Sequence, residues 1–103
     1  MSTVTNVILA FSIMEEDHEG ILLARVNEYF SANELGRGFV PLASDSLGGT
    51  KALECPTFVG AFNCLGLLDF LAHLRTLPWL EPEFVQVFAC RQDDECYALF
   101  PVF

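Results

Sequence analysis

The chain has few basic residues, with five Lys and Arg against fourteen Asp and Glu in 103 residues. Its formal net charge at pH 7 is therefore −9. Nucleic-acid backbones and anionic membrane surfaces are both bound mainly through Lys and Arg. The charge balance argues against a nucleic acid or a membrane as partner, and it can steer a basic protein toward the chain.

A targeting segment, a long hydrophobic run and a cysteine motif are also missing. The first residues, MSTVTNVILAFSIMEED, contain no basic segment and no small-residue cleavage site, so we expect no secretory signal. No apolar run approaches the ~18 residues of a membrane span. The cysteines form no CxxC pair, which is unlike a zinc site or a dense disulfide framework. These absences predict a cytoplasmic protein with four reduced thiols: Cys55, Cys64, Cys90 and Cys96.

Two of these cysteines, Cys90 and Cys96, flank the last predicted turn. A three-residue loop centred on Asp93 would place them directly opposite each other, close enough for a disulfide or a shared metal. A loop of two or four residues would offset them by one position. The sequence leaves this register open.

Apolar residues, by contrast, are abundant. They make up 52 % of the chain and include ten Phe, whereas Asp, Glu, Lys and Arg supply only 18 %, below the roughly 25 % of a typical soluble domain. A chain of this length folds as one domain, which we assign to residues 1–103. Surplus apolar surface on such a domain usually lies in a subunit interface or a binding groove.

The spacing of the apolar residues predicts five strands and two helices in the order β-α-β-β-α-β-β. This order is typical of an α+β ferredoxin-like sheet, with strand order 4-1-3-2, both helices on one face and the fifth strand beyond the fourth. Pro41 predicts an edge position for the second strand, because proline has no N–H for a second neighbour. We expect strands at 4–14, 39–44, 52–63, 84–91 and 96–103, and helices at 20–32 and 65–77.

In this fold one face of the sheet has no helices to cover it. Ile8 and Ala10 of the first strand are expected there, with part of the third strand and one alternating set of the fourth. These residues are too apolar for a surface in contact with water, so we expect a homodimer or a bound protein partner. The two possible sets of the fourth strand are Phe84 and Phe88, or Val85, Val87 and Ala89.

The predicted topology brings three acidic connections to one end of the sheet. We expect a carboxylate of this acidic end to cap the first helix. The spacing of the acids differs from the D-x-D-x-D-G pattern of a calcium loop, so no metal is predicted. Trp79 and Phe84 lie close by as partner anchors or as core residues. The candidate binding residues are Glu15, Glu16, Asp17, His18, Glu19, Asp45, Glu81 and Glu83.

An alternative ligand or active site involves Asp69 and His73, which are four residues apart on the second helix and can touch. Cys64, near the start of that helix, is a candidate nucleophile. Cys64 and His73 are however separated by ~13 Å along the helix axis, at 1.5 Å per residue. They cannot hydrogen-bond to each other, so no catalytic residue is predicted.

These observations favour a non-catalytic, acidic protein-binding module without a cofactor. It would be an inhibitor, immunity-type or adaptor protein that acts through the open face of its sheet and through its acidic end. The alternative is an oligomeric ferredoxin-like protein that binds a small ligand, or an enzyme, with a pocket beside the sheet.

Overall fold

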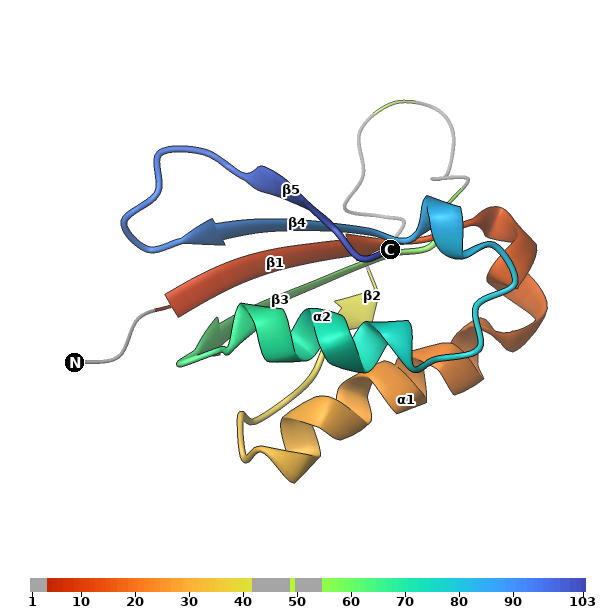
Figure 1. Ribbon diagram of the computed structural model, residues 1–103, viewed down its shortest axis with the longest axis horizontal. Coiled ribbons are helices and arrows are strands. Elements are labelled where there is room, and N and C mark those ends of the chain that lie inside the picture. Colours follow the sequence, from red (N-terminus) through yellow and green to blue (C-terminus); the bar gives the residue numbers. More distant parts are fainter. Residues whose placement is uncertain (1–3, 42–48, 50–54) are drawn as a thin grey trace.

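The computed structural model describes residues 4–41, 49 and 55–103. Five antiparallel strands form one sheet in the order β2-β3-β1-β4-β5. Both α-helices lie on the same side of this sheet (Figure 1). The elements are β1 (Val4–Ala10), the 3₁₀ helix η1 (Ile13–His18), α1 (Glu19–Ala32), β2 (Val40–Pro41), β3 (Thr57–Asn63), α2 (Leu67–Arg75), the 3₁₀ helix η3 (Pro82–Phe84), β4 (Gln86–Arg91) and β5 (Ala98–Pro101).

The predicted α+β class is confirmed, and β1 is the central strand of the sheet. The second strand lies at an edge, as Pro41 predicted, but it is only two residues long. Compared with a four-stranded ferredoxin-like sheet, this sheet has an additional strand, β5, beyond β4. No helix in the described ranges combines the length and the apolarity needed to cross a membrane.

The first strand ends earlier than predicted, at Ala10 rather than Met14. The Oγ atom of Ser12 accepts a hydrogen bond from the N–H of Met14 at 3.1 Å, and the carbonyl of Ser12 accepts one from Glu15 at 3.0 Å. These local bonds replace the ladder of the sheet and start η1. The apolar alternation that extends to Met14 therefore predicts the strand correctly but not its end.

The helix boundaries also differ from the prediction. The N-cap of α1 is His18, which makes no side-chain capping bond, so the predicted carboxylate cap is wrong; Glu19 occupies the first turn, near the positive end of the helix dipole. Helix α2 begins at Leu67, two residues later than predicted, with Gly66 as N-cap. Cys64 has a φ of 58°, in the left-handed region, and it lies outside the helix.

The core lies between the helices and the sheet and is rich in aromatic rings. The rings of Phe30 and Phe62 stack with centroids 4.2 Å apart. Gly60 makes room for them, because a Cβ atom at this position would collide with the ring of Phe62. Trp79 is buried, and its Nε1–H donates to the carbonyl of Leu74 at 2.8 Å, so it is a core residue.

Helix α2 does not bury all of its large apolar residues. Leu68 is 78 % exposed, whereas Phe70 is 0 % exposed and packs against Phe30. Both positions are apolar, so the spacing alone does not decide between them. The rotation of α2 about its axis, which turns Phe70 toward the aromatic cluster, decides which of the two residues is buried.

Candidate functional site

Glu15 is the only acid of the acidic end that is completely buried among the described side chains, with 0 % exposure. The N–H of Leu80 donates to both of its carboxylate oxygens, at 2.9 and 3.0 Å, and the N–H of Glu81 donates at 3.1 Å. The Nε2 atom of His18 lies 2.8 Å from Oε1. Glu15 thus connects η1 to the segment that precedes η3, and it cannot touch a partner itself.

The environment of Glu15 keeps its carboxylate ionised. Burial by itself raises the pKa of this group, but the N–H groups of Glu81 and Leu80 and the His18 imidazole outweigh burial. The pKa of Glu15 is therefore lowered from its ordinary value. A charged acceptor with several donors is a strong structural link, so Glu15 positions the acidic end.

The other predicted residues of the acidic end have different surroundings. Asp17 and Glu83 are exposed, and His18, Glu19 and Glu81 are partly exposed. Hydrogen bonds join Glu15 to His18 and to the backbone of Glu81. Asp45 and the side chain of Glu16 lie outside the described part of the structure.

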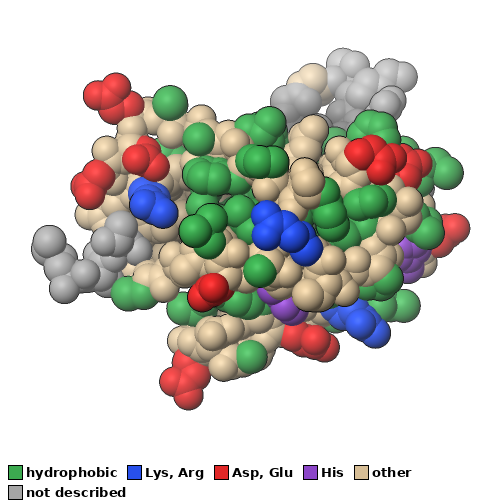
Figure 2. All heavy atoms as spheres, viewed as in Figure 1, with side chains coloured by type: hydrophobic (Ala, Val, Ile, Leu, Met, Phe, Trp, Pro, Cys, Tyr) green, Lys and Arg blue, Asp and Glu red, His purple; other side chains and the backbone are tan. Residues whose placement is uncertain are grey.

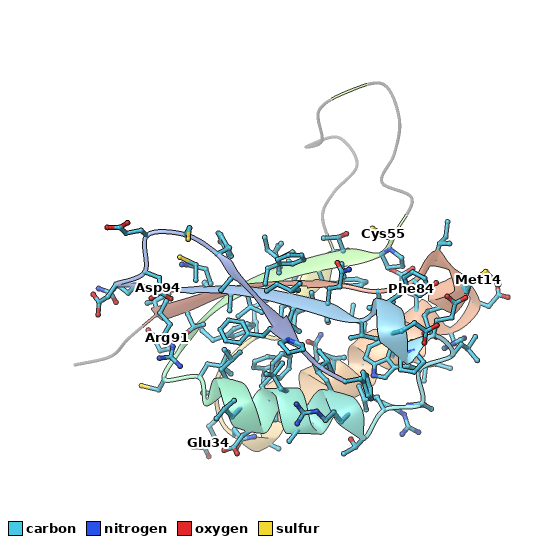
Figure 3. All side chains as sticks on the ribbon, turned by 45° about the horizontal axis from the view of Figure 1, so that its top comes forward. Met14, Glu34, Cys55, Phe84, Arg91 and Asp94 are labelled. Atoms are coloured by element: carbon cyan, nitrogen blue, oxygen red, sulfur yellow. The ribbon has the colours of Figure 1, made fainter. Side chains whose placement is uncertain are left out.

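A pocket of about 450 Å³ opens at this end of the molecule. Its wall is formed where β1 passes into η1 and where η3 passes into β4. Figure 3 shows Met14, Cys55 and Phe84 close to this end, and Arg91 and Asp94 at the opposite end. The lining residues are Ala10, Phe11, Ser12, Ile13, Met14, Cys55, Glu81, Phe84 and Gln86.

Among the described residues that line this pocket, Glu81 is the only charged one. Its Oε2 atom accepts a hydrogen bond from the Oγ of Ser12 at 3.2 Å. Glu81 is one of the binding residues predicted from the sequence. Ser12, Ile13 and Met14 are not, because the prediction placed them in the first strand. The available signal was the position of two large apolar residues directly before a run of acids.

The face of the sheet opposite the helices carries a line of apolar residues, one from each strand, which we call the apolar row. Val40 is paired with Val59, Val59 with Ile8, Ile8 with Phe88, and Phe88 with Leu99. Residues directly opposite each other in an antiparallel pair have their side chains on the same face. The row therefore crosses the whole sheet on this open face.

The residues beside the apolar row are small or uncharged. On one side of it Asn6 is paired with Ala61 and Cys90, and on the other Ala10 is paired with Thr57 and Gln86. The expected positions of Ile8 and Ala10 are confirmed. Of the two sets left open for the fourth strand, Phe88 lies on this face, whereas Val85, Val87 and Ala89 are buried and Phe84 lies in η3. In Figure 2 hydrophobic side chains gather over β4 and β5, and acidic side chains lie at both ends of the molecule.

The alternative residues Asp69, His73 and Cys64 are not connected to one another by any hydrogen bond in the described part of the chain. The Nε2–H of His73 donates to the carbonyl of Arg25 at 2.8 Å and links α2 to α1. His73 thus has a structural partner that explains it without a ligand. Asp69 and Cys64 are exposed. Burial raises the pKa of the Tyr29 hydroxyl, and the charge of the nearby Asp69 raises this pKa further.

The register of the last hairpin decides the geometry of Cys90 and Cys96. Ala89 is opposite Ala98, so the two cysteines are offset by one position. All four cysteines have free thiols. Within the described ranges, no group of three or more His, Cys, Asp and Glu residues is arranged to hold a metal ion.

Comparison of the chain with protein-family models, with curated proteins and with solved structures gives no significant match. The features that bear on function are therefore two surfaces of the molecule, the open face and the pocket at the acidic end.

Proposed function

We propose that this chain is a non-catalytic, acidic protein-binding module that forms a homodimer through its open face and binds a basic protein target at its acidic end. The observation that carries the proposal is the apolar row, which extends across all five strands. Such a face on a single soluble domain usually lies in an interface. An inhibitor, immunity-type or adaptor protein fits this description.

A second copy of the chain is the occupant that the charges favour. The described strand residues on both sides of the apolar row carry no charge, although the chain has a net charge of −9. Two copies can therefore join these faces without burying a carboxylate, whose desolvation would be costly. Contact between acidic surfaces would instead bring like charges together.

The side chains of the apolar row are also complementary to themselves. Ile8 is at its centre, Val40 and Val59 form the smaller half, and Phe88 and Leu99 form the larger half. A twofold axis parallel to β1 would place the larger half of one copy against the smaller half of the other, as in a packed pair of sheets. The same axis places both acidic ends at one end of the dimer.

We further propose a ferredoxin-like topology and a cytoplasmic location. The order of elements and the neighbours of β1, β3 and β4 support the topology, with β5 as an addition. The four free thiols support a reducing compartment.

Replacement of Phe88 tests the dimer. Phe88→Asp places a carboxylate in the apolar row, and we expect the molecular mass in solution to fall from that of a dimer to that of a monomer. The matched control is Leu68→Asp, which makes the same kind of change on the exposed side of α2. It should leave the dimer intact.

The masses would be measured by light scattering, and circular dichroism would verify that both variants are folded. A wild-type protein that has the mass of a monomer at all accessible concentrations would contradict the proposal. A dimer that is weakened equally by both variants would also contradict it.

A further inference from the structure

We infer that the pocket at the acidic end receives a lysine side chain of the target protein. The inference depends on the proposed protein-binding function and specifies the chemistry that the target must present. It follows from the size and position of the pocket, the hydrogen bonds of the Glu81 carboxylate and the apolar residues at the rim.

The size and position of the pocket suit a side chain from another protein. Its volume of about 450 Å³ lies in the range of roughly 300 to 1,000 Å³ that is usual for ligand pockets. Ala10 and Gln86, which are paired on the open face, also line the pocket. Ile13, Met14 and Phe84 extend the pocket beyond the strands, so it continues the open face toward the acidic end.

The carboxylate of Glu81 is held in position without a ligand. The Oγ–H of Ser12 donates to Oε2, and this Oγ in turn accepts from the N–H of Met14. The backbone N–H of Glu81 donates to the buried Glu15. A group that is ordered before binding loses less entropy on binding, which raises affinity.

The hydrogen bonds of Glu81 favour an ammonium group over a guanidinium group. Ser12 already uses one acceptor position of Oε2, and no hydrogen bond to Oε1 is found within the described residues. Arginine is favoured where both carboxylate oxygens accept a parallel pair of bonds. Because Oε2 is already partly engaged, a single bond to Oε1 suits the compact point charge of a lysine.

The rest of the pocket suits the aliphatic part of lysine. Met14 and Phe84 are 61 % and 52 % exposed, and Phe11 is buried at the wall. Lysine packs its methylene groups along apolar surface while its charged end reaches a polar partner. Among the described residues no Lys or Arg lines the pocket, so an ammonium group meets no like charge from them.

Two peptides of matched shape test the inference on the full-length protein. The first is acetyl-Leu-Lys-Leu-amide, and in the second norleucine replaces the lysine and removes only the ammonium group. Binding would be measured by NMR titration of the backbone amide signals. We expect the lysine peptide to bind roughly fivefold more tightly, as is typical of a hydrogen-bonded charge at a partly exposed site.

Two variants with the same charge change locate the effect. Glu81→Gln should remove the preference for the lysine peptide, because the amide has no negative charge for the ammonium group. Glu95→Gln, in the exposed turn between β4 and β5 at the opposite end of the sheet, should retain it. Equal losses in the two variants would mean that only the general negative charge matters, and this would overturn the inference.

Further probes separate the alternatives. Equal binding of the lysine and norleucine peptides to the wild-type protein would overturn the role of Glu81. A third peptide, acetyl-Leu-Arg-Leu-amide, tests the choice of an ammonium group, and tighter binding of this peptide than of the lysine peptide would overturn that choice. Tighter binding of free hexylamine than of the lysine peptide would identify a small amine instead of a protein side chain. If the peptides give one of these contrary results but the protein has the mass of a dimer, the pocket inference is wrong and the proposed dimer interface still stands.

Discussion

The two ends of the sheet are both acidic, but they are built differently. At one end Glu15 is buried and receives hydrogen bonds from two backbone N–H groups. At the other end Asp93, Asp94 and Glu95, in the turn between β4 and β5, are all exposed. The Oδ2 of Asp94 accepts a bond from the N–H of Arg91 within the same turn.

This difference shows that acids in a cluster do not have equivalent roles. An exposed carboxylate exchanges hydrogen bonds with water and contributes little to stability. A buried carboxylate must have internal partners, and its removal leaves those partners unpaired. Glu15 therefore holds η1 and η3 together around the pocket, whereas the acids of the hairpin contribute mainly charge.

The largest effect is expected from Glu15→Ala. The N–H groups of Leu80 and Glu81 lose their acceptor, so we expect a loss of about 3 kcal/mol in the free energy of unfolding. Urea denaturation would measure it. Asp94→Ala at the opposite end is the control and should cost less than about 0.5 kcal/mol. Equal losses at the two ends would mean that the contrast between them is wrong.

Lowering the pH should reveal the contribution of the Glu15 charge to the free energy of unfolding without a substitution. Its pKa in the folded protein is lower than the ordinary value of 4.5. Its stabilising effect is therefore complete above that value and is lost as the pH falls through the folded pKa. We expect the wild-type protein to lose stability over this acidic range.

The variant Glu15→Gln isolates this effect, because glutamine does not titrate. It should be less stable than the wild-type protein at neutral pH, and the difference should shrink as the pH falls. Denaturation curves recorded across the acidic range would show it. A difference that stays constant with pH would indicate that ionisation of Glu15 does not contribute to stability.

A smaller effect is expected from Ser12→Ala at the pocket end. The Oγ of Ser12 accepts a bond from the N–H of Met14 and donates one to the carboxylate of Glu81, and both bonds are partly buried. We expect a loss of about 1 kcal/mol in the free energy of unfolding, measured in urea. Ser31→Ala at the exposed end of α1 is a matched control and should be nearly neutral. A neutral Ser12→Ala would show that Ser12 does not hold the turn.

Much of the fold was predictable because it depends on local patterns. Apolar residues on both faces of β1 predict its central position, and Pro41 predicts an edge strand. The expected place of Ile8 on the open face is confirmed, and the register of β1 and β4 decides that Phe88 lies beside it. The end of β1 was predicted wrongly because the hydrogen bonds of Ser12 decide it. The start of α2 was predicted wrongly because the left-handed backbone of Cys64 delays it.

The candidate site was less predictable. Glu15 looks like its neighbours in the run EEDHE, and nothing nearby in the chain distinguishes it. Its main partners, Leu80 and Glu81, are 65 and 66 residues away. The bond between Ser12 and Glu81 spans 69 residues. Such contacts form only when the fold brings the two segments together.

The sequence by itself determined the class of the fold, the acidic character and the presence of surplus apolar side chains, because composition and periodicity are local properties. Only the tertiary structure decided which carboxylate is buried, which one faces the pocket, and that five apolar residues form one row. These properties depend on strand register and on contacts between distant segments, and local sequence patterns specify neither of them.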